Sequence, residues 1–151
     1  MMLLSRKMRY SESAQDARVF GMASLAKPTV YVVDDDADVL GSLRFLLEAD
    51  GFAIRTFRNG PALLNAVRLT GVDCFVIDYK MPDMNGIDLV NRLRNRDITA
   101  PIILITGYPD ANILARAAAA GIRDVVQKPL LEESLIAHIR GAIQEVRPVT
   151  G

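Results

Sequence analysis

The sequence predicts an α/β fold in which five parallel strands form a doubly wound sheet with five helices on its two faces. Short β-branched runs alternate with longer segments of helical apolar spacing, five times in succession. Ala, Val, Leu and Ile supply most of the apolar residues and there is no Trp, which is typical of a parallel sheet covered by helices. Right-handed crossovers leave few topologies for five strands, and the order 2-1-3-4-5 is the leading choice.

The first two strand–helix units show this rhythm. Residues 30–33 are a short apolar run that predicts a buried strand, and residues 52–57 are predicted to form the second strand. The helix between them ends at Gly51 and carries an apolar stripe of Val39, Leu40, Leu43, Leu46 and Leu47. Asn59 is suited to cap the second helix, with Pro61 in its first turn. The inner face of that helix is predicted to carry Leu63, Leu64 and Val67.

Three further units complete the sheet. Strands are predicted at residues 74–77, 101–105 and 125–126. The third helix carries Ile87, Leu89, Val90 and Leu93. An Ala-rich fourth helix at residues 113–120 is closed by Gly121. The last helix is predicted to bury a stripe of Leu131, Leu135, Ile136, Ile139, Ile143 and Val146.

Composition limits the classes of function. The 151 residues suffice for one domain with a full core, and a single Cys excludes a disulfide framework or a Cys-based zinc site. Apolar runs such as residues 102–105 are too short to span a bilayer, so no membrane association is expected. The formal net charge of zero argues against direct DNA binding.

The ends of the chain differ from its middle. Residues 1–28 hold five basic and two acidic residues and lack steady periodicity, which predicts a disordered tail. The globular domain is expected at residues 29–147, followed by a short tail at 148–151. Basic residues follow the brief apolar start, unlike the order in a signal peptide. Whether Met22 is the true start stays open.

Polar side chains follow four of the predicted strands. Asp34 and Asp35 follow the first, Asp78 the third, Thr106 the fourth and Lys128 the fifth. The carboxyl ends of parallel strands meet at one edge of a sheet, where clustered carboxylates repel one another. Mg²⁺ relieves such repulsion and prefers oxygen ligands, and Asp carboxylates can accept phosphoryl groups. Taken singly, an Asp after a strand is more often a cap or turn residue, as expected for Asp36 and Asp38, and a lone Lys is usually a solvated charge.

Longer motifs give the chain a family resemblance. The segments VYVVDDDADVLGSLRFLLEADGF, FVIDYKMPDMNGIDLVNRLR, APIILITGYPDANILARAAAAGI and DVVQKPL resemble a two-component response regulator receiver domain of the FixJ type, over about residues 29–147. The acidic pair, D-x-x-M-P-x-x-x-G, the hydroxyl-G and the K-P are specific as a set. The resemblance implies a flavodoxin-like fold, a cytoplasmic location and a signalling protein that catalyses only its own phosphorylation, rather than an enzyme.

The resemblance also implies roles for the residues at the strand ends. Asp78 would accept a phosphoryl group from a histidine kinase or a histidine phosphotransfer protein. Asp34, Asp35, Asp78 and the backbone carbonyl of Lys80 would hold Mg²⁺.

The remaining motif residues would act on the phosphoryl group itself. Thr106 would donate a hydrogen bond to it, Lys128 would form an ion pair with it, and the Lys128–Pro129 bond would be cis. Lys80 and Tyr108 would tune its lifetime, although Lys80 can equally be a solvent-facing side chain.

Val125 departs from the family pattern, which usually has Phe or Tyr three residues before the Lys. Val has no ring to rotate between two poses. We therefore expect phosphorylation to act through residues 107–110 and the Ala-rich helix, and to change hydrogen exchange most in residues 106–121 and little at Val125.

Three residues outside the motifs have weaker signals. Phe45 lies opposite the apolar face of the first helix, so it is either a docking residue or an isolated exposed ring. His138 is expected to be a half-exposed surface residue. Cys74, within a strand, is expected to be inert.

The leading function is that of a receiver that binds an unknown downstream protein or passes its phosphoryl group onward. Because five residues follow Val146, we expect it to stand alone; the alternative is the receiver of a larger transcription factor or hybrid kinase. A magnesium-dependent aspartyl-phosphate phosphatase is a distant alternative. It would need an Asp two residues beyond its nucleophile. Asp78 is followed at that position by Lys80, although Asp34 is followed there by Asp36. It would also need a cap insertion that the sequence lacks. A flavin-binding relative of the fold is disfavoured because residues 34–36 would repel the flavin phosphate.

Overall fold

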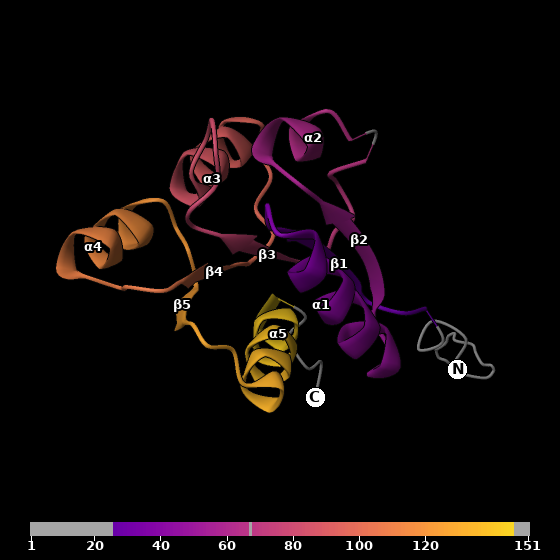
Figure 1. The fold of residues 1–151 in the computed structure, drawn as a ribbon. Helices are drawn as coiled ribbons and strands as arrows, with labels where there is room; N and C mark the ends of the chain where they lie inside the picture. The colour runs from indigo at the N-terminus through magenta and orange to yellow at the C-terminus, as the bar shows by residue number, and fades with distance from the viewer. Residues whose placement is uncertain (1–25, 67, 147–151) are drawn as a thin grey trace.

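The computed structural model describes residues 26–66 and 68–146. Strands and helices alternate along this part of the chain (Figure 1). The strands are β1 (Thr29–Val33), β2 (Ala53–Phe57), β3 (Cys74–Asp78), β4 (Ile102–Thr106) and β5 (Asp124–Gln127). The helices are α1 (Ala37–Ala49), α2 (Gly60–Leu64), α3 (Gly86–Asn95), α4 (Ala111–Ala119) and α5 (Glu132–Val146).

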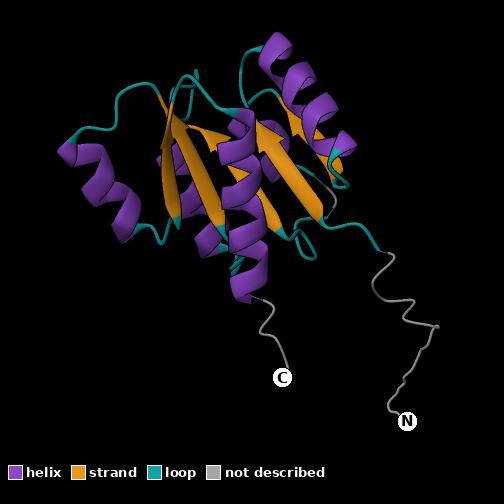
Figure 2. Cartoon of the chain, turned by 90° about the horizontal axis from the view of Figure 1, so that it is seen from below, coloured by secondary structure: helices purple, strands orange, loops and turns teal. Residues whose placement is uncertain are grey.

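The sheet has the predicted topology. Its strands are all parallel and lie in the order β2-β1-β3-β4-β5. Helices α1 and α5 cover one face and α2, α3 and α4 the other (Figures 1 and 2). The α/β fold class and the strand order are therefore confirmed.

Both faces of the sheet are covered by helices, which explains why its three inner strands, β1, β3 and β4, are almost entirely apolar. Along β1, Val30 and Val32 pack into the core under α1 and α5, whereas Tyr31 and Val33 pack into the core on the opposite face. The Tyr31 ring centroid lies 5.2 Å from that of Phe57. The central strands β3 and β4 are buried at every position, so they form a rigid base for the residues at their carboxyl ends.

Asx caps start the four helices that precede α5. The Asp36 side chain accepts hydrogen bonds from the backbone of Asp38 and Val39, as expected for the cap of α1. Asn59 caps α2, also as expected, and Asn85 and Asp110 cap α3 and α4. Each cap satisfies backbone N–H groups at the start of a helix on the side of the sheet where the strands end.

Several predicted details are wrong. Leu131 is 72% exposed because it precedes the first residue of α5 and so cannot belong to its buried stripe. Val146, at the last turn of that helix, is 61% exposed. Helix α2 ends at Leu64, earlier than the pattern indicated, because Asn65 closes it with backbone hydrogen bonds.

Some predictions lie outside the described residues, and those for His138 and Cys74 can be compared with the structure. Val67, residues 1–25 of the predicted tail and residues 147–151 lie outside the described residues. His138 is half-buried, as expected, with Nδ1 3.0 Å from Asp124 Oδ2. Cys74 is fully buried, and burial raises the pKa of its thiol to about 12, which agrees with an inert core residue.

Candidate functional site

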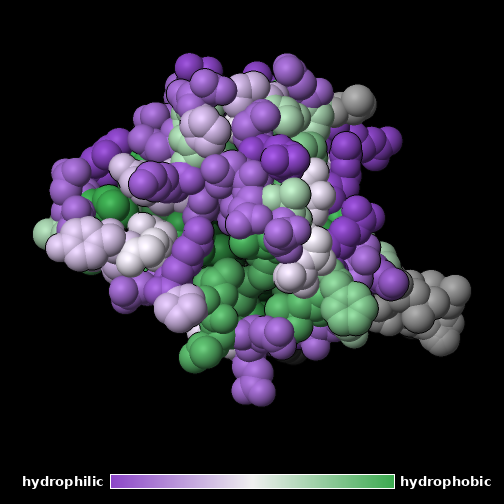
Figure 3. All heavy atoms as spheres, in the orientation of Figure 1, coloured by the Kyte–Doolittle hydropathy of each residue, from purple (hydrophilic) through white to green (hydrophobic). Residues whose placement is uncertain are grey.

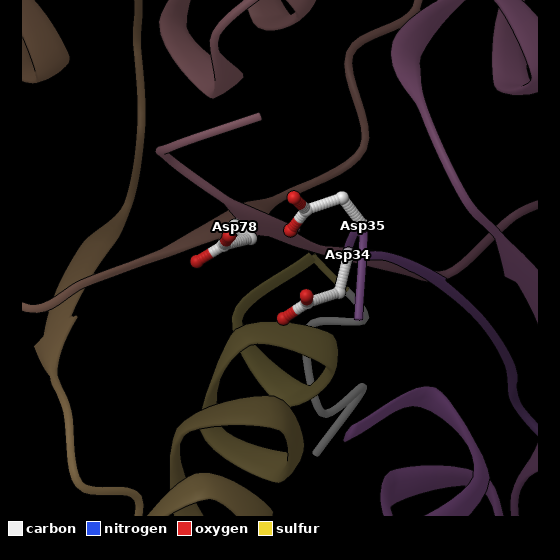
Figure 4. A group of neighbouring side chains, drawn as sticks. All are labelled: Asp34, Asp35 and Asp78. Atoms are coloured by element: carbon white, nitrogen blue, oxygen red, sulfur yellow. The ribbon is translucent and has the colours of Figure 1, made fainter. Parts of the chain in front are cut away.

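Three carboxylates meet at the carboxyl edge of the sheet. Asp34 directly follows β1, where its backbone N–H donates to the Phe57 carbonyl, and Asp78 is the last residue of β3. One carboxylate oxygen from each of Asp34, Asp35 and Asp78 lies within 4.8 Å of the others. Their carboxylates point to the same side in Figure 4. Asp34 and Asp78 are 2% and 3% exposed, whereas Asp35 is exposed at the rim.

Lys128 brings a positive charge to this cluster. Its Nζ lies 2.9 Å from Asp78 Oδ1. The chain positions it just after β5, where its backbone N–H donates to the Thr106 carbonyl at 2.9 Å. The following peptide bond, Lys128–Pro129, is cis, as the resemblance implied.

Thr106 ends β4 next to the carboxylates. Asp78 is paired with Ile105 in the sheet, so Thr106 lies one residue beyond that pair. Its side chain is buried, and its Oγ1 accepts a 3.2 Å hydrogen bond from the backbone N–H of Tyr108. The Thr106 hydroxyl proton is therefore still available for donation to a ligand.

The structure places the other predicted site residues at the surface. Lys80 and the Tyr108 side chain are both exposed, two residues beyond Asp78 and Thr106. Their predicted tuning roles, and the metal-binding role of the Lys80 carbonyl, stay predictions. Val125, at the position of the family aromatic, is half-buried and packs against the core beneath α2, α3 and α4.

Burial makes the two inner carboxylates hard to ionise. It raises the pKa of Asp34 to about 6, an effect that the charge of Asp78 strengthens and a backbone hydrogen bond from Asp36 opposes. Burial also raises the pKa of Asp78, although Lys128 opposes this shift. For Lys128, burial alone would lower the ammonium pKa, but the hydrogen bond and charge of Asp78 raise it.

This donor set fits Mg²⁺. The ligand atoms are carboxylate oxygens, which this hard cation prefers, and no His or Cys belongs to the cluster that the described residues form. Lys128 supplies one positive charge against three carboxylates. A divalent cation would remove the remaining repulsion and the cost of ionising the buried groups.

Gly86 holds the loop after β3 against the sheet. A Cβ at this position would lie 2.6 Å from the Asp78 carbonyl oxygen and 2.8 Å from Leu104 Cδ1. The Gly86 N–H donates to the Tyr79 carbonyl at 2.8 Å. The glycine of D-x-x-M-P-x-x-x-G therefore allows the start of α3 to approach the backbone of the phosphoacceptor candidate.

Sequence reasoning missed Arg58 at this edge. Its Nε donates to the Asp35 carbonyl at 3.3 Å, so it braces the turn that carries the acidic pair. A single exposed Arg after a strand gives no signal in a sequence, since its acceptor is a backbone atom.

An apolar groove between α1 and α5 adjoins the acidic cluster. It has a volume of about 400 Å³, and Lys128 forms part of its lining. Its apolar lining consists of Val39, Leu43, Leu46, Pro129, Leu130 and Leu135. Figure 3 shows hydrophobic residues gathered over this region. Phe45, on α1, is 78% exposed, as the helical spacing predicted. No helix in the described residues is long and apolar enough to cross a membrane.

Known proteins resemble this chain in both sequence and fold. FixJ, a transcriptional regulatory protein of Bradyrhizobium diazoefficiens, is 35% identical over 122 residues, which cover 81% of this chain and 60% of FixJ. The response regulator protein TodT of Pseudomonas putida is 34% identical over 115 residues, which cover 76% of this chain and 51% of TodT. The chain thus spans between half and two thirds of the length of these relatives.

Solved structures show the same architecture. A CheY-like receiver domain protein from Methanospirillum hungatei aligns with a TM-score of 0.76 at 23% identity, covering 81% of this chain and 98% of that one. The receiver domain of a signal transduction histidine kinase from Syntrophus aciditrophicus aligns with a TM-score of 0.72 at 27% identity, covering 82% and 96%. Residues 30–140 match the family described as the response regulator receiver domain. The chain therefore belongs to the response regulator receiver domains of two-component systems, with FixJ-like relatives.

Proposed function

We propose that this receiver takes a phosphoryl group from a phosphohistidine onto Asp78 and thereby changes the surface that it offers to a downstream protein. The observation that carries this proposal is the position of the Asp78 carboxylate, buried between two other Asp side chains and the Lys128 ammonium. The donor is a histidine kinase or a histidine phosphotransfer protein.

The transfer is a displacement at phosphorus. A carboxylate oxygen of Asp78 forms the new O–P bond while the P–N bond to the imidazole of the donor breaks, and the imidazole nitrogen keeps the electron pair. Bound Mg²⁺, held by Asp34, Asp35 and Asp78, would neutralise the phosphoryl oxygens. Lys128 then exchanges its contact with Asp78 Oδ1 for one with a phosphoryl oxygen, and the Thr106 hydroxyl donates to another.

The groove between α1 and α5 supports a docking place for the donor. It is apolar and adjoins Lys128, and α1, which forms one of its sides, also carries the exposed ring of Phe45. A helix that presents apolar residues could bury them there and bring its phosphohistidine toward Asp78. We therefore propose that Phe45 contacts the kinase or the phosphotransfer protein.

Output is proposed to pass through protein contact rather than DNA binding by this chain. The curated relatives are named as regulators, and the chain covers 60% of FixJ, so the activity of those whole proteins is not transferred to it. The phosphatase alternative is disfavoured, because exposed Lys80 stands two residues beyond Asp78, where an acid/base Asp would be required. Asp36, at the same spacing from Asp34, has its side chain occupied as the cap of α1.

Phosphotransfer profiling tests the donor class. Each histidine kinase of the host is phosphorylated with labelled ATP and mixed with this chain for a short time. We expect rapid transfer from one or a few kinases to the wild-type chain and none to Asp78→Asn. Equal transfer to both chains, or no transfer from any kinase or phosphotransfer protein, would overturn the proposal.

A further inference from the structure

Helix α4 is tied firmly to the domain at its C-terminal end. The guanidinium of Arg94, on α3, donates to four backbone carbonyls of two separate segments. Nη1 donates to Ile98 and Ala100, each at 2.9 Å. Nε donates to Ala120 at 3.4 Å, and Nη2 to Gly121 at 2.9 Å. One side chain thus joins the end of α4 to the connection between α3 and β4.

The charge of Arg94 suits this position. Burial lowers its pKa, yet an Arg stays protonated, and no carboxylate among the described residues forms an ion pair with it. Its partners at α4 are carbonyls at the helix C-terminus, where unpaired carbonyls and the helix dipole favour a cation. Gly121, with φ of 75°, closes the helix beneath the guanidinium.

The N-terminal end of α4 is held loosely. In the loop at residues 107–110, the hydrogen bonds made by the described residues stay within the loop and the first turn of α4, except the one from Tyr108 N–H to Thr106 Oγ1. The Tyr108 side chain is 74% exposed. Within α4 itself, Ile113 and Ala117 are the buried residues. Among the hydrogen bonds of the described residues, the one to the Thr106 hydroxyl therefore links this loop to the sheet, and Ile113 packs into the core one turn further along.

We propose that α4 is a lever that pivots about Arg94 and is driven at its other end by Thr106. This inference rests on the proposed phosphorylation of Asp78. When a phosphoryl group draws the Thr106 hydroxyl toward Asp78, the Tyr108 N–H must follow its acceptor or lose it. Displacement then enters at residues 107–110 and diminishes along α4 toward the carbonyls held by Arg94. Hydrogen exchange is therefore expected to change in the first half of residues 106–121 and not over the whole of that segment.

The test compares hydrogen exchange with and without beryllofluoride, a phosphoryl mimic, in the presence of Mg²⁺. In the wild-type chain, we expect exchange in residues 107–114 to change severalfold and exchange in residues 118–123 to stay the same. In Arg94→Met, the change should spread into residues 118–123. Arg96→Met is the matched control, because Arg96 lies at the same end of α3 and donates to one carbonyl, that of Leu64, at 2.7 Å.

A ¹⁹F spectrum and a second Arg94 variant distinguish a failure of the proposed function from a failure of the lever. The ¹⁹F spectrum of bound beryllofluoride reports occupancy, and no binding to the wild-type chain would overturn the proposed function and the lever together. Full occupancy with an even change along α4 would overturn the lever alone. If Arg94→Met fails to fold, the decrease in the exchange change along α4 of the wild-type chain still tests the lever. Arg94→Lys keeps the charge but not the fork of donors, so its exchange change should extend into residues 118–123 less than in Arg94→Met and more than in the wild type. A spread in Arg94→Met no greater than in Arg96→Met would also contradict the pivot.

Discussion

Lys128 Nζ lies 2.9 Å from Asp78 Oδ1, although Asp78 ends β3 and Lys128 follows β5, two strands that β4 separates. Among the described residues, this is the ion pair that reaches the acidic cluster. Asp34 forms no ion pair with another described residue, and burial raises its pKa. The cluster is thus poised to take up positive charge, which leads to predictions on metal binding and on pH.

Removing the rim carboxylate should weaken Mg²⁺ binding. Asp35→Asn replaces a charged carboxylate ligand by a neutral amide. We therefore expect the Mg²⁺ affinity to fall on the order of tenfold or more, where tenfold corresponds to about 1.4 kcal/mol of binding free energy. Isothermal titration calorimetry measures it. Asp36→Asn is the control, since Asn caps α1 equally well and Asp36 lies outside the cluster. Phosphorylation by a small donor should slow strongly in EDTA, and an unchanged rate there would contradict a role for the metal.

In the absence of metal, the raised pKa of Asp34 should make the domain less stable as pH rises. The unfolded carboxyl loses its proton near its ordinary pKa of 3.8, whereas the folded one keeps it until about 6. Between these values the folded state binds more protons, so the free energy of unfolding falls with rising pH, by at most on the order of 3 kcal/mol.

Urea unfolding in EDTA across this pH range measures the effect. Asp34→Asn should flatten the slope and raise stability at neutral pH relative to the wild type. Saturating Mg²⁺ should stabilise the wild type and have less effect on the variant. Parallel stability curves for the two chains would show that Asp34 carries no such penalty.

Gly86→Ala should destabilise the domain and disturb the site. The new methyl group would collide with the Asp78 carbonyl and Leu104, which we expect to cost about 1–3 kcal/mol, and phosphorylation by a small donor should slow. Gly41→Ala is the control, because nothing lies within 4 Å of its Cβ position and Ala favours the helix there. Chemical denaturation of both variants checks this, and an equal response would refute the packing argument.

Phe45→Ala should slow phosphotransfer from the cognate kinase and leave phosphorylation by a small donor intact. The reason is that Phe45 lies outside the acidic cluster but is exposed on the helix that lines the groove. Leu114→Ala serves as the control, because Leu114 is also an exposed apolar side chain but lies on a different helix, α4. Equal slowing with both donors would point to a folding defect instead of a lost contact.

The sequence was sufficient to predict the sheet and the acidic cluster for one physical reason. Strands buried on both faces read as apolar runs, and a parallel sheet brings the residues after those runs to one edge. Asp34, Asp35, Asp78 and Lys128 were found in this way. Periodicity was less useful at helix ends: Leu131 fits the stripe of α5 yet precedes the helix and is exposed.

Contacts to backbone atoms were beyond sequence reasoning. Arg94 and Arg58 both donate to carbonyls, which every residue possesses, so no partner residue marks them. The close approach at Gly86 likewise depends on the path of the loop after β3. Such contacts depend on where the strands, loops and helix ends lie relative to one another, which the three-dimensional structure supplies.

The most direct test of the account is the site of phosphorylation. The chain is incubated with acetyl phosphate and Mg²⁺, and the product is examined by intact and peptide mass spectrometry. We expect the wild-type chain to gain the mass of one phosphoryl group on Asp78 and the Asp78→Asn chain to gain none. Stable phosphorylation of Asp78→Asn, or a wild-type label on any other residue, would contradict the account.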